Sequence, residues 1–309
     1  MNLTTRYLGL TLPHPFVVGA SPLTEDLAMV SRLEDAGAAA IVMHSLFEEE
    51  VRNHAGAAGE YLEQLLRIKR RVGIPVIASL NGTDAEGWLH YARLIQQAGA
   101  DAIELNFYHV ATDVFEDAAH VERRLLDIVA VLEESIAVPL AVKLSPFYSA
   151  LPHLASQIDR LGADGLVLFN RFYQPDINPK SLETEMRIQL SDSSELPLRL
   201  RWIAILWSRL RLSLAASGGV HDAIDAVKAV MAGAHVVQMV SALLRNGPAW
   251  MTAVRLEFER WGDANGYDTI ESLRGRMGLS GYHEPDIERG HYQRILQSWH
   301  VPGLPVAGH

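Results

Sequence analysis

Eight short apolar segments alternate with longer amphipathic segments along this chain, and this alternation limits its fold more than any other feature. The apolar segments are too short for helices and too continuously apolar for strands with one solvated face. Such strands are typical of a parallel sheet that is covered on both sides. We predict strands at residues 16–20, 40–43, 76–80, 102–106, 140–144, 165–169, 212–217 and 236–240.

The segments between and after these strands carry apolar residues at spacings of three and four, which predicts helices. They cover residues 27–36, 61–72, 85–98, 121–135, 151–161, 200–210, 221–232 and 249–261. Eight repeats of a strand and a helix predict a single-domain α/β protein with the TIM (β/α)8 barrel fold. A doubly wound open sheet is the alternative, but its nucleotide-binding forms carry a glycine-rich turn after the first strand. Here that turn reads Ala20-Ser21-Pro22-Leu23, which favours the barrel.

Two regions fall outside the repeat. Residues 171–197 form a long polar insertion after the sixth strand, and an insertion of this length in a compact fold usually covers a functional site or is disordered. Residues 278–309 form a tail rich in Gly, Pro and His, which we expect to pack on the outside of the barrel.

Composition and charge narrow the choice of partners. The 309 residues include no cysteine, which excludes disulfides and thiolate metal sites, and we assign no metal site. The first residues lack the pattern of a signal peptide, and no apolar segment is long enough to span a membrane. A net charge of −10 argues against nucleic-acid binding. We therefore expect a cytoplasmic protein with neither nucleic-acid nor membrane partners.

Small or polar residues follow the predicted strands, at the end where a TIM barrel builds its active site. The candidate cofactor-binding residues are Ala20, Ser21, His44, Ser45, Asn81, Asn106, Lys143, Asn170, Ser217, Gly218, Gly219, Val240 and Ser241. Ser217-Gly218-Gly219 is the sharpest signal, because small residues let backbone N–H groups approach a phosphate and the next helix favours its charge. The eighth strand ends beside this turn, so we predict a phosphate site there.

Lys143 places a cation in an otherwise apolar strand, which is costly unless the ammonium meets an anion or strong acceptors. We interpret Lys143 as a donor to an electron-rich cofactor ring. Asn106 ends the fourth strand, and its amide offers both donors and an acceptor to a planar ring or a carboxylate. Glu104, on the same strand, fits an inter-strand hydrogen bond.

Together these motifs resemble the dihydroorotate dehydrogenases, a family of FMN-dependent barrels. The matching segments, in the family's order and spacing, are His14-Pro15-Phe16, Ala20-Ser21, Glu104-Leu105-Asn106, Val142-Lys143-Leu144-Ser145-Pro146, Ser217-Gly218-Gly219-Val220, Gly233-Ala234 and Gly266-Tyr267-Asp268-Thr269-Ile270. The resemblance implies FMN as the cofactor and a homodimer as the assembly. It places Ser21, Asn106 and Lys143 at the isoalloxazine ring, and Gly218, Gly219 and Ser241 at the phosphate.

Departures from the family pattern set this chain apart. His44 replaces a flavin-contacting lysine, and the segment after it lacks the family's substrate-binding asparagines. The loop after Asn106 lacks the usual Cys or Ser base, and His109 falls at that position. A histidine is suited to proton transfer at neutral pH. We therefore predict catalytic roles for His109 and Lys143, with Tyr108 as the reserve base.

The resulting prediction is an FMN-dependent dehydrogenase that acts on the CH–CH bond of dihydroorotate or a related small substrate, together with a redox partner subunit. One alternative is a non-redox lyase or isomerase that binds a phosphate ligand and uses Lys143. A second is an FMN-binding electron-transfer subunit without its own substrate, which the missing base favours. A tRNA-dihydrouridine synthase is disfavoured by the acidic net charge.

Overall fold

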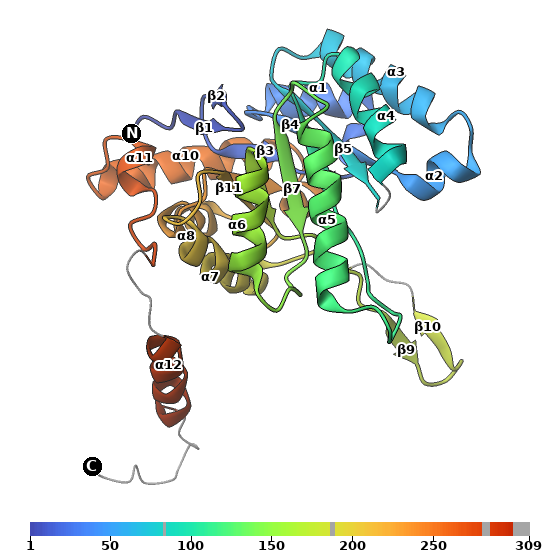
Figure 1. Ribbon diagram of the computed structural model, residues 1–309. Helices are drawn as coiled ribbons and strands as arrows, with labels where there is room; N and C mark the ends of the chain where they lie inside the picture. Colours follow the sequence, from blue (N-terminus) through green and yellow to red (C-terminus); the bar gives the residue numbers. More distant parts are fainter. Residues whose placement is uncertain (83–84, 186–188, 280–284, 299–309) are drawn as a thin grey trace.

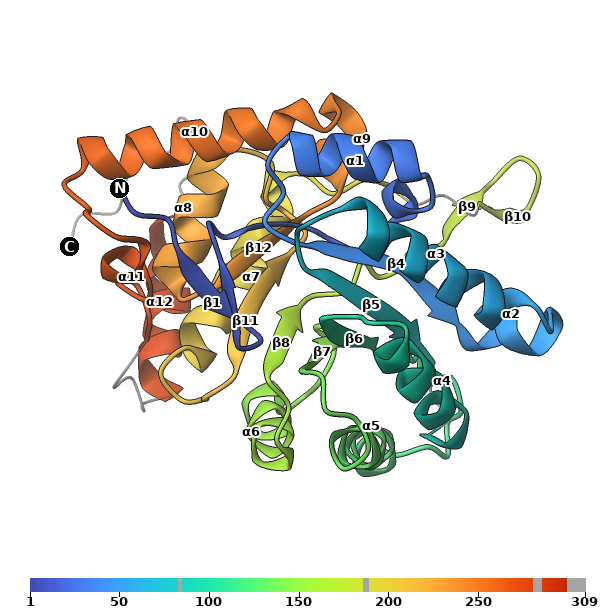
Figure 2. The same ribbon diagram turned by 90° about the horizontal axis from the view of Figure 1, so that it is seen from above.

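A computed structural model describes residues 1–82, 85–185, 189–279 and 285–298. Its eight central strands are parallel and close into a barrel, because the last of them pairs back to the first (Figures 1 and 2). In barrel order the strands are β3 (Phe16–Val18), β4 (Ile41–Phe47), β5 (Val76–Asn81), β6 (Ala102–Asn106), β7 (Leu140–Leu144), β8 (Gly165–Leu168), β11 (Ser213–Ser217) and β12 (Val236–Met239). The predicted TIM barrel is confirmed, and the open-sheet alternative is wrong.

Helices surround the barrel in an outer layer (Figure 2). The longer ones are α1 (Leu27–Asp35), α3 (Ala57–Arg71), α4 (Ala85–Gln97), α5 (Ala118–Glu133), α6 (Leu151–Leu161), α7 (Leu196–Leu206), α8 (Ala223–Ala232) and α10 (Ala249–Ala264). Shorter segments are η1 (Pro22–Thr24), α2 (Glu48–Asn53), η2 (Ser193–Glu195), α9 (Ser241–Asn246), α11 (Ile270–Leu273) and α12 (Pro285–Ser298). One apolar cluster fills the space between strands and helices, and a second fills the inside of the barrel.

Three helices begin earlier than predicted; α5 begins at Ala118 rather than at residue 121, and the two larger errors, in α7 and α3, have a local cause. Helix α7 begins at Leu196 rather than at residue 200, because Pro197 lies in its first turn, where a missing N–H costs nothing. Helix α3 begins at Ala57 rather than at residue 61, since its first turn lacks the apolar spacing on which the prediction depended. The insertion after β8 is therefore slightly shorter than 171–197.

An amino-terminal hairpin that the sequence did not reveal closes one end of the barrel. It consists of β1 (Thr5–Tyr7) and β2 (Leu10–Leu12), which pair antiparallel. Tyr7, Leu8 and Leu12 are fully buried against the residues that fill the barrel interior. The hairpin is fixed by a hydrogen bond from the backbone N–H of Leu8 to Oγ of Ser213, at 3.2 Å. Three-residue strands are too short to give a readable pattern.

A β-bulge in β4 changes which of its side chains face the barrel interior. The register moves from Val42 opposite Ile77 to Ser45 opposite Ser79, so β4 has one residue more than β5 in this stretch. Such a bulge re-aims the side chains beyond it. Ser45 therefore faces inward and its Oγ lies 2.8 Å from Oγ of Ser79. The predicted strand ended at residue 43, whereas β4 continues to Phe47.

The insertion and the tail differ in their relation to the barrel. The insertion begins with a projecting hairpin, β9 (Asp176–Asn178) and β10 (Glu183–Glu185), and then returns to the rim of the barrel (Figure 1). The expected packing of the tail is wrong for its described helix, since residues 291–298 of α12 are all exposed. Residues 280–284 and 299–309 of the tail lie outside the described residues. In the described part of the chain, no helix has the length and apolar character that a membrane crossing requires.

Candidate functional site

A cavity of about 280 Å³ lies at the carboxyl ends of β3, β7, β11 and β12, beneath the returning part of the insertion. In a TIM barrel this is the end that carries the active site. The cavity brings together eight of the residues predicted from the sequence, namely Ala20, Ser21, Lys143, Ser217, Gly218, Gly219, Val240 and Ser241.

Two glycines form the tightest part of the cavity wall. Gly218 and Gly219 have φ angles of 84° and 82°, a conformation that side chains rarely tolerate. A Cβ atom on Gly219 would lie 2.5 Å from the backbone nitrogen of Leu196, at the start of α7. Only glycine therefore fits at position 219, and its backbone lies close to the space above the strand ends.

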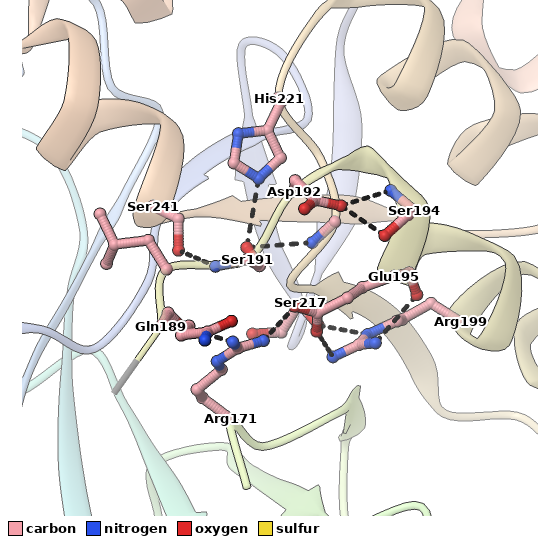
Figure 3. A network of polar contacts seen from close by, with 12 residues as sticks. Arg171, Gln189, Ser191, Asp192, Ser194, Glu195, Arg199, Ser217, His221 and Ser241 are labelled. Atoms are coloured by element: carbon pink, nitrogen blue, oxygen red, sulfur yellow. Dashed lines mark hydrogen bonds and ion pairs between the residues drawn. The ribbon is translucent and has the colours of Figure 1, made fainter. Parts of the chain in front are cut away.

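Ser191 of the insertion connects the glycine turn to the start of α9, just after the eighth strand (Figure 3). The N–H of Gly219 donates to Oγ of Ser191 at 3.5 Å, and the N–H of Ser191 donates to Oγ of Ser241 at 3.1 Å. Nε2 of His221 lies 3.2 Å from the same Ser191 hydroxyl. Three segments that are distant in sequence thus meet in one cluster of small polar groups.

Arginines brace this cluster from the insertion side (Figure 3). Arg199 is buried, and its Nε donates to the carbonyl of Ser217 at 3.1 Å. Arg171 pairs with Glu195. Arg245 donates to the carbonyl of Ser191 at 2.8 Å. Sequence reasoning missed Ser191 and Arg171, because the only signal in their favour was the length of the insertion. It also missed Arg199, which lies in the first turn of α7, before the predicted start of that helix.

The floor of the cavity is a buried polar layer inside the barrel. Nζ of Lys143 lies 3.0 Å from Oε1 of Glu104, and Nε2 of Gln238 donates to Oε2 of Glu104 at 2.6 Å. All three residues are buried, and Lys143 and Gln238 also line the cavity. The expected inter-strand bond of Glu104 is confirmed, and the anion that Lys143 required proves to be this carboxylate.

Three buried polar atoms at or near the cavity have no partner in the described structure. They are Oγ of Ser21, Oδ1 of Asn106 and Oε1 of Gln238. Buried polar groups in native proteins are almost always hydrogen-bonded, so such a group calls for a ligand or water. Ser21 and Gln238 line the cavity itself. This end of the barrel therefore fits a ligand with several hydrogen-bonding atoms.

Other predicted residues lie near the cavity without lining it. Asn81 and Asn170 are buried, and the amide of Asn170 donates to the carbonyls of Phe107 and Lys143 at 3.4 and 3.5 Å. The bulge in β4 directs Ser45 into the barrel. His44 lies on the outer side, where its ring packs edge-on against Tyr61 of α3 at 5.2 Å. Burial lowers the pKa of His44, and Glu25 and Glu50 oppose that effect.

The predicted base His109 borders a second cavity of about 380 Å³. The reserve base Tyr108 packs beside this cavity, against Phe172. Nε2 of His109 lies 3.0 Å from Oε2 of Glu116, and Arg124 of α5 pairs with the same carboxylate. The hydrogen bond with His109 lowers the pKa of Glu116. His109 shares this cavity with Ser145, Phe147 and Phe172. His109 therefore lines this second cavity and not the main one.

Tyr108 joins the loop after β6 to the insertion. Its hydroxyl accepts a hydrogen bond from the N–H of Tyr173 at 3.1 Å. Its ring stacks on Phe172 with centroids 4.8 Å apart, and Phe147 packs edge-on against Phe172 at the same distance. Three successive loops thus contribute one aromatic side chain each to the rim, a cluster we call the aromatic rim (Tyr108, Phe147 and Phe172).

Comparison with known proteins identifies the family to which the chain belongs. Residues 51–261 match the family described as dihydroorotate dehydrogenase. The chain is 28% identical over 300 residues to the catalytic subunit of dihydroorotate dehydrogenase B (NAD(+)) from Thermoplasma acidophilum, covering 89% of this chain and 98% of that protein. It is 23% identical over 343 residues to the NAD-dependent dihydropyrimidine dehydrogenase subunit PreA of Escherichia coli, covering 95% and 82%. The chain therefore belongs to the dihydroorotate dehydrogenase family.

Proposed function

We propose that this protein is an FMN-dependent oxidoreductase that acts on the CH–CH bond of dihydroorotate or a related small substrate. The observation that carries the proposal is the main cavity, in which a close-approach glycine turn, a buried lysine and unpartnered polar atoms meet at the carboxyl end of the barrel. Membership of the dihydroorotate dehydrogenase family supports the same activity.

The residues of the cavity fit FMN in two parts. Backbone N–H groups at Ser217-Gly218-Gly219 and the hydroxyl of Ser241 would hold the phosphate, with Ala20 and Val240 beside it. Ser21, Asn106 and Lys143 would contact the isoalloxazine ring, which offers hydrogen-bonding atoms to the free Oγ and Oδ1 atoms. When bound, FMN supplies the hydride acceptor. His44 would not contact FMN, since its ring lies outside the barrel interior, against Tyr61.

A base must accompany the hydride acceptor, because a CH–CH bond that loses a hydride must lose a proton from the adjacent carbon. We propose His109 for this role. Its Nε2 is held by Glu116, which leaves Nδ1 for a substrate in the second cavity. His109→Gln is expected to slow reduction of the flavin by substrate about 10²- to 10⁴-fold while FMN binding stays unchanged. Anaerobic stopped-flow absorbance measures both; a variant as fast as the wild type would move the role to Tyr108.

The charges around the rim favour a neutral ring over a carboxylate as substrate. Lys143, Arg171 and Arg124 each already pair with a carboxylate, namely Glu104, Glu195 and Glu116. A paired cation offers little further attraction to a substrate anion. The aromatic rim instead provides apolar surface for a planar ring. We therefore propose a neutral dihydropyrimidine ahead of dihydroorotate, in line with the name of the Escherichia coli relative.

Visible spectroscopy and mass analysis of the purified protein test this function first. The expected result is a yellow protein that releases one FMN per chain. Anaerobic titration with dihydrouracil and with dihydroorotate should then bleach the flavin, at least tenfold more readily with the neutral compound. A colourless protein that also fails to bind added FMN would exclude the oxidoreductase and favour the phosphate-ligand lyase or isomerase.

A second candidate is an FMN-binding electron-transfer subunit without a substrate of its own. The polar contacts of His109 with Glu116 and Arg124 favour this second candidate, because they hold the imidazole ring away from the main cavity. Relatives are named as subunits, which supports a redox partner in either case. Flavin that binds but is bleached by neither substrate would identify this role. The expected homodimer and cytoplasmic location stay predictions.

A further inference from the structure

Glu104 holds a position that neither the cofactor contacts nor the proposed base explain. Its side chain is 1% exposed, and both of its carboxylate oxygens are occupied. Oε1 meets the ammonium of Lys143 at 3.0 Å, and Oε2 accepts from Gln238 at 2.6 Å. Gln238 comes from β12, on the side of the barrel opposite β6, so a single carboxylate fixes two residues that face the cavity.

Closing the barrel does not require this charged layer. The layer directly beneath it is apolar, with Ala102, Ala141 and Val236 on the same three strands as Glu104, Lys143 and Gln238. Apolar residues of suitable volume therefore fill this interior well, and a buried ion pair is seldom more stabilising than such packing. Among these three strands the charged layer lies where the interior becomes the floor of the cavity, which links it to binding in that cavity.

We propose that Glu104 is a positioning residue that sets the reduction potential of the bound flavin through Lys143. The inference rests on the proposed function. Reduction of a flavin by two electrons and one proton adds one negative charge to the ring, and charges near the ring tune that equilibrium. The ammonium of Lys143 favours the reduced form. The carboxylate of Glu104, at 3.0 Å, offsets part of that positive charge and fixes where it lies.

Glu104→Gln tests the proposal, because the amide keeps the size and the bond to Gln238 but removes the charge. The flavin potential of the holoprotein is measured at fixed pH against a redox dye of known potential. We expect the ratio of reduced to oxidised flavin to rise at least tenfold, which is about 30 mV for a two-electron couple. An unchanged or lower potential would overturn the proposal.

A double-mutant cycle tests whether the effect passes through Lys143. Glu104→Gln should shift the potential much less in a Lys143→Met background than in the wild type; equal shifts in both would show that Glu104 acts without Lys143 and would overturn this route. Asp101→Asn is the matched control, since it breaks the 2.6 Å pair with Lys69 at the other end of β6. The flavin potential of Asp101→Asn should equal that of the wild type. A rise as large as that of Glu104→Gln would mean that loss of any negative charge raises the potential, and would overturn the proposal.

A second variant and the FMN content of the wild type distinguish the remaining outcomes. If Glu104→Gln does not fold, Glu104→Asp retains the charge but withdraws it from Lys143, and a smaller rise in potential is expected; no rise would contradict the proposal. A wild-type protein that binds no FMN would instead refute the proposed function. A wild type that binds FMN, with no shift in the variants, would refute only the role of Glu104.

Discussion

Lys143→Met is expected to lower the unfolding free energy of the cofactor-free protein by about 3–5 kcal/mol. The substitution leaves the fully buried carboxylate of Glu104 without its cation, and an uncompensated charge in a barrel interior is strongly destabilising. Because Lys143 also lines the main cavity, affinity for FMN should fall at least tenfold. Urea denaturation of the apoprotein measures the first effect, and fluorescence titration with FMN measures the second.

The double variant Lys143→Met/Glu104→Gln separates charge from packing. It removes both charges and keeps similar volumes, so most of the lost unfolding free energy should return. The FMN affinity should not return, since the ammonium is still missing. If Lys143→Met unfolds at the same urea concentration as the wild type, the methionine side chain stabilises the fold as well as the ion pair does, and the prediction fails.

Gly219→Ala should be strongly damaging, because the added methyl group would meet backbone atoms and not the end of a flexible side chain. The φ angle of 82° costs a side chain about 1–2 kcal/mol. The added Cβ would also meet the backbone of Leu196 at 2.5 Å, and overpacking of this kind costs about 1–3 kcal/mol. Relief requires the glycine turn and the start of α7 to move apart. We therefore expect a loss of about 2–5 kcal/mol in unfolding free energy and at least a hundredfold loss in FMN affinity.

Gly99→Ala provides the matched control for that substitution. Gly99 has a similar φ angle of 88°, but nothing lies within 4 Å of the Cβ that alanine would add. Only the backbone strain remains, about 1–2 kcal/mol, and FMN affinity should be unchanged. Equal losses of stability in the two variants would mean that contact with Leu196 is unimportant.

The barrel could be predicted from sequence because its strands are buried on both faces. Strands such as β6 and β7 were located to the residue, since a continuous apolar run has sharp ends. The β1–β2 hairpin was missed, as its strands are three residues long and its burial depends on the barrel that it closes. Helix α12 shows the opposite error, because the tail was expected to pack on the barrel and residues 291–298 are exposed in the described structure.

The site could be predicted only where each residue's role follows from its strand. Lys143 and Gly219 lie at strand ends, and the topology alone brings them to one cavity. His44 illustrates the failure, because a single extra residue in β4 moves its ring from the interior to the helix layer. Ser191 and Arg171 reach the cavity through the insertion, whose path no local pattern specifies.

The β1–β2 hairpin is joined to a strand that is far away in the sequence. Leu8 donates to Ser213, which is synthesised 205 residues later. At about 5–20 residues per second, synthesis of that interval takes about 10–40 s. Throughout that time the burial of Tyr7, Leu8 and Leu12 is incomplete, because Ala215 and Val236 of their apolar cluster are not yet synthesised. The nascent chain therefore carries an incompletely buried, aggregation-prone apolar segment, and the yield of folded protein should depend on how fast translation reaches β11.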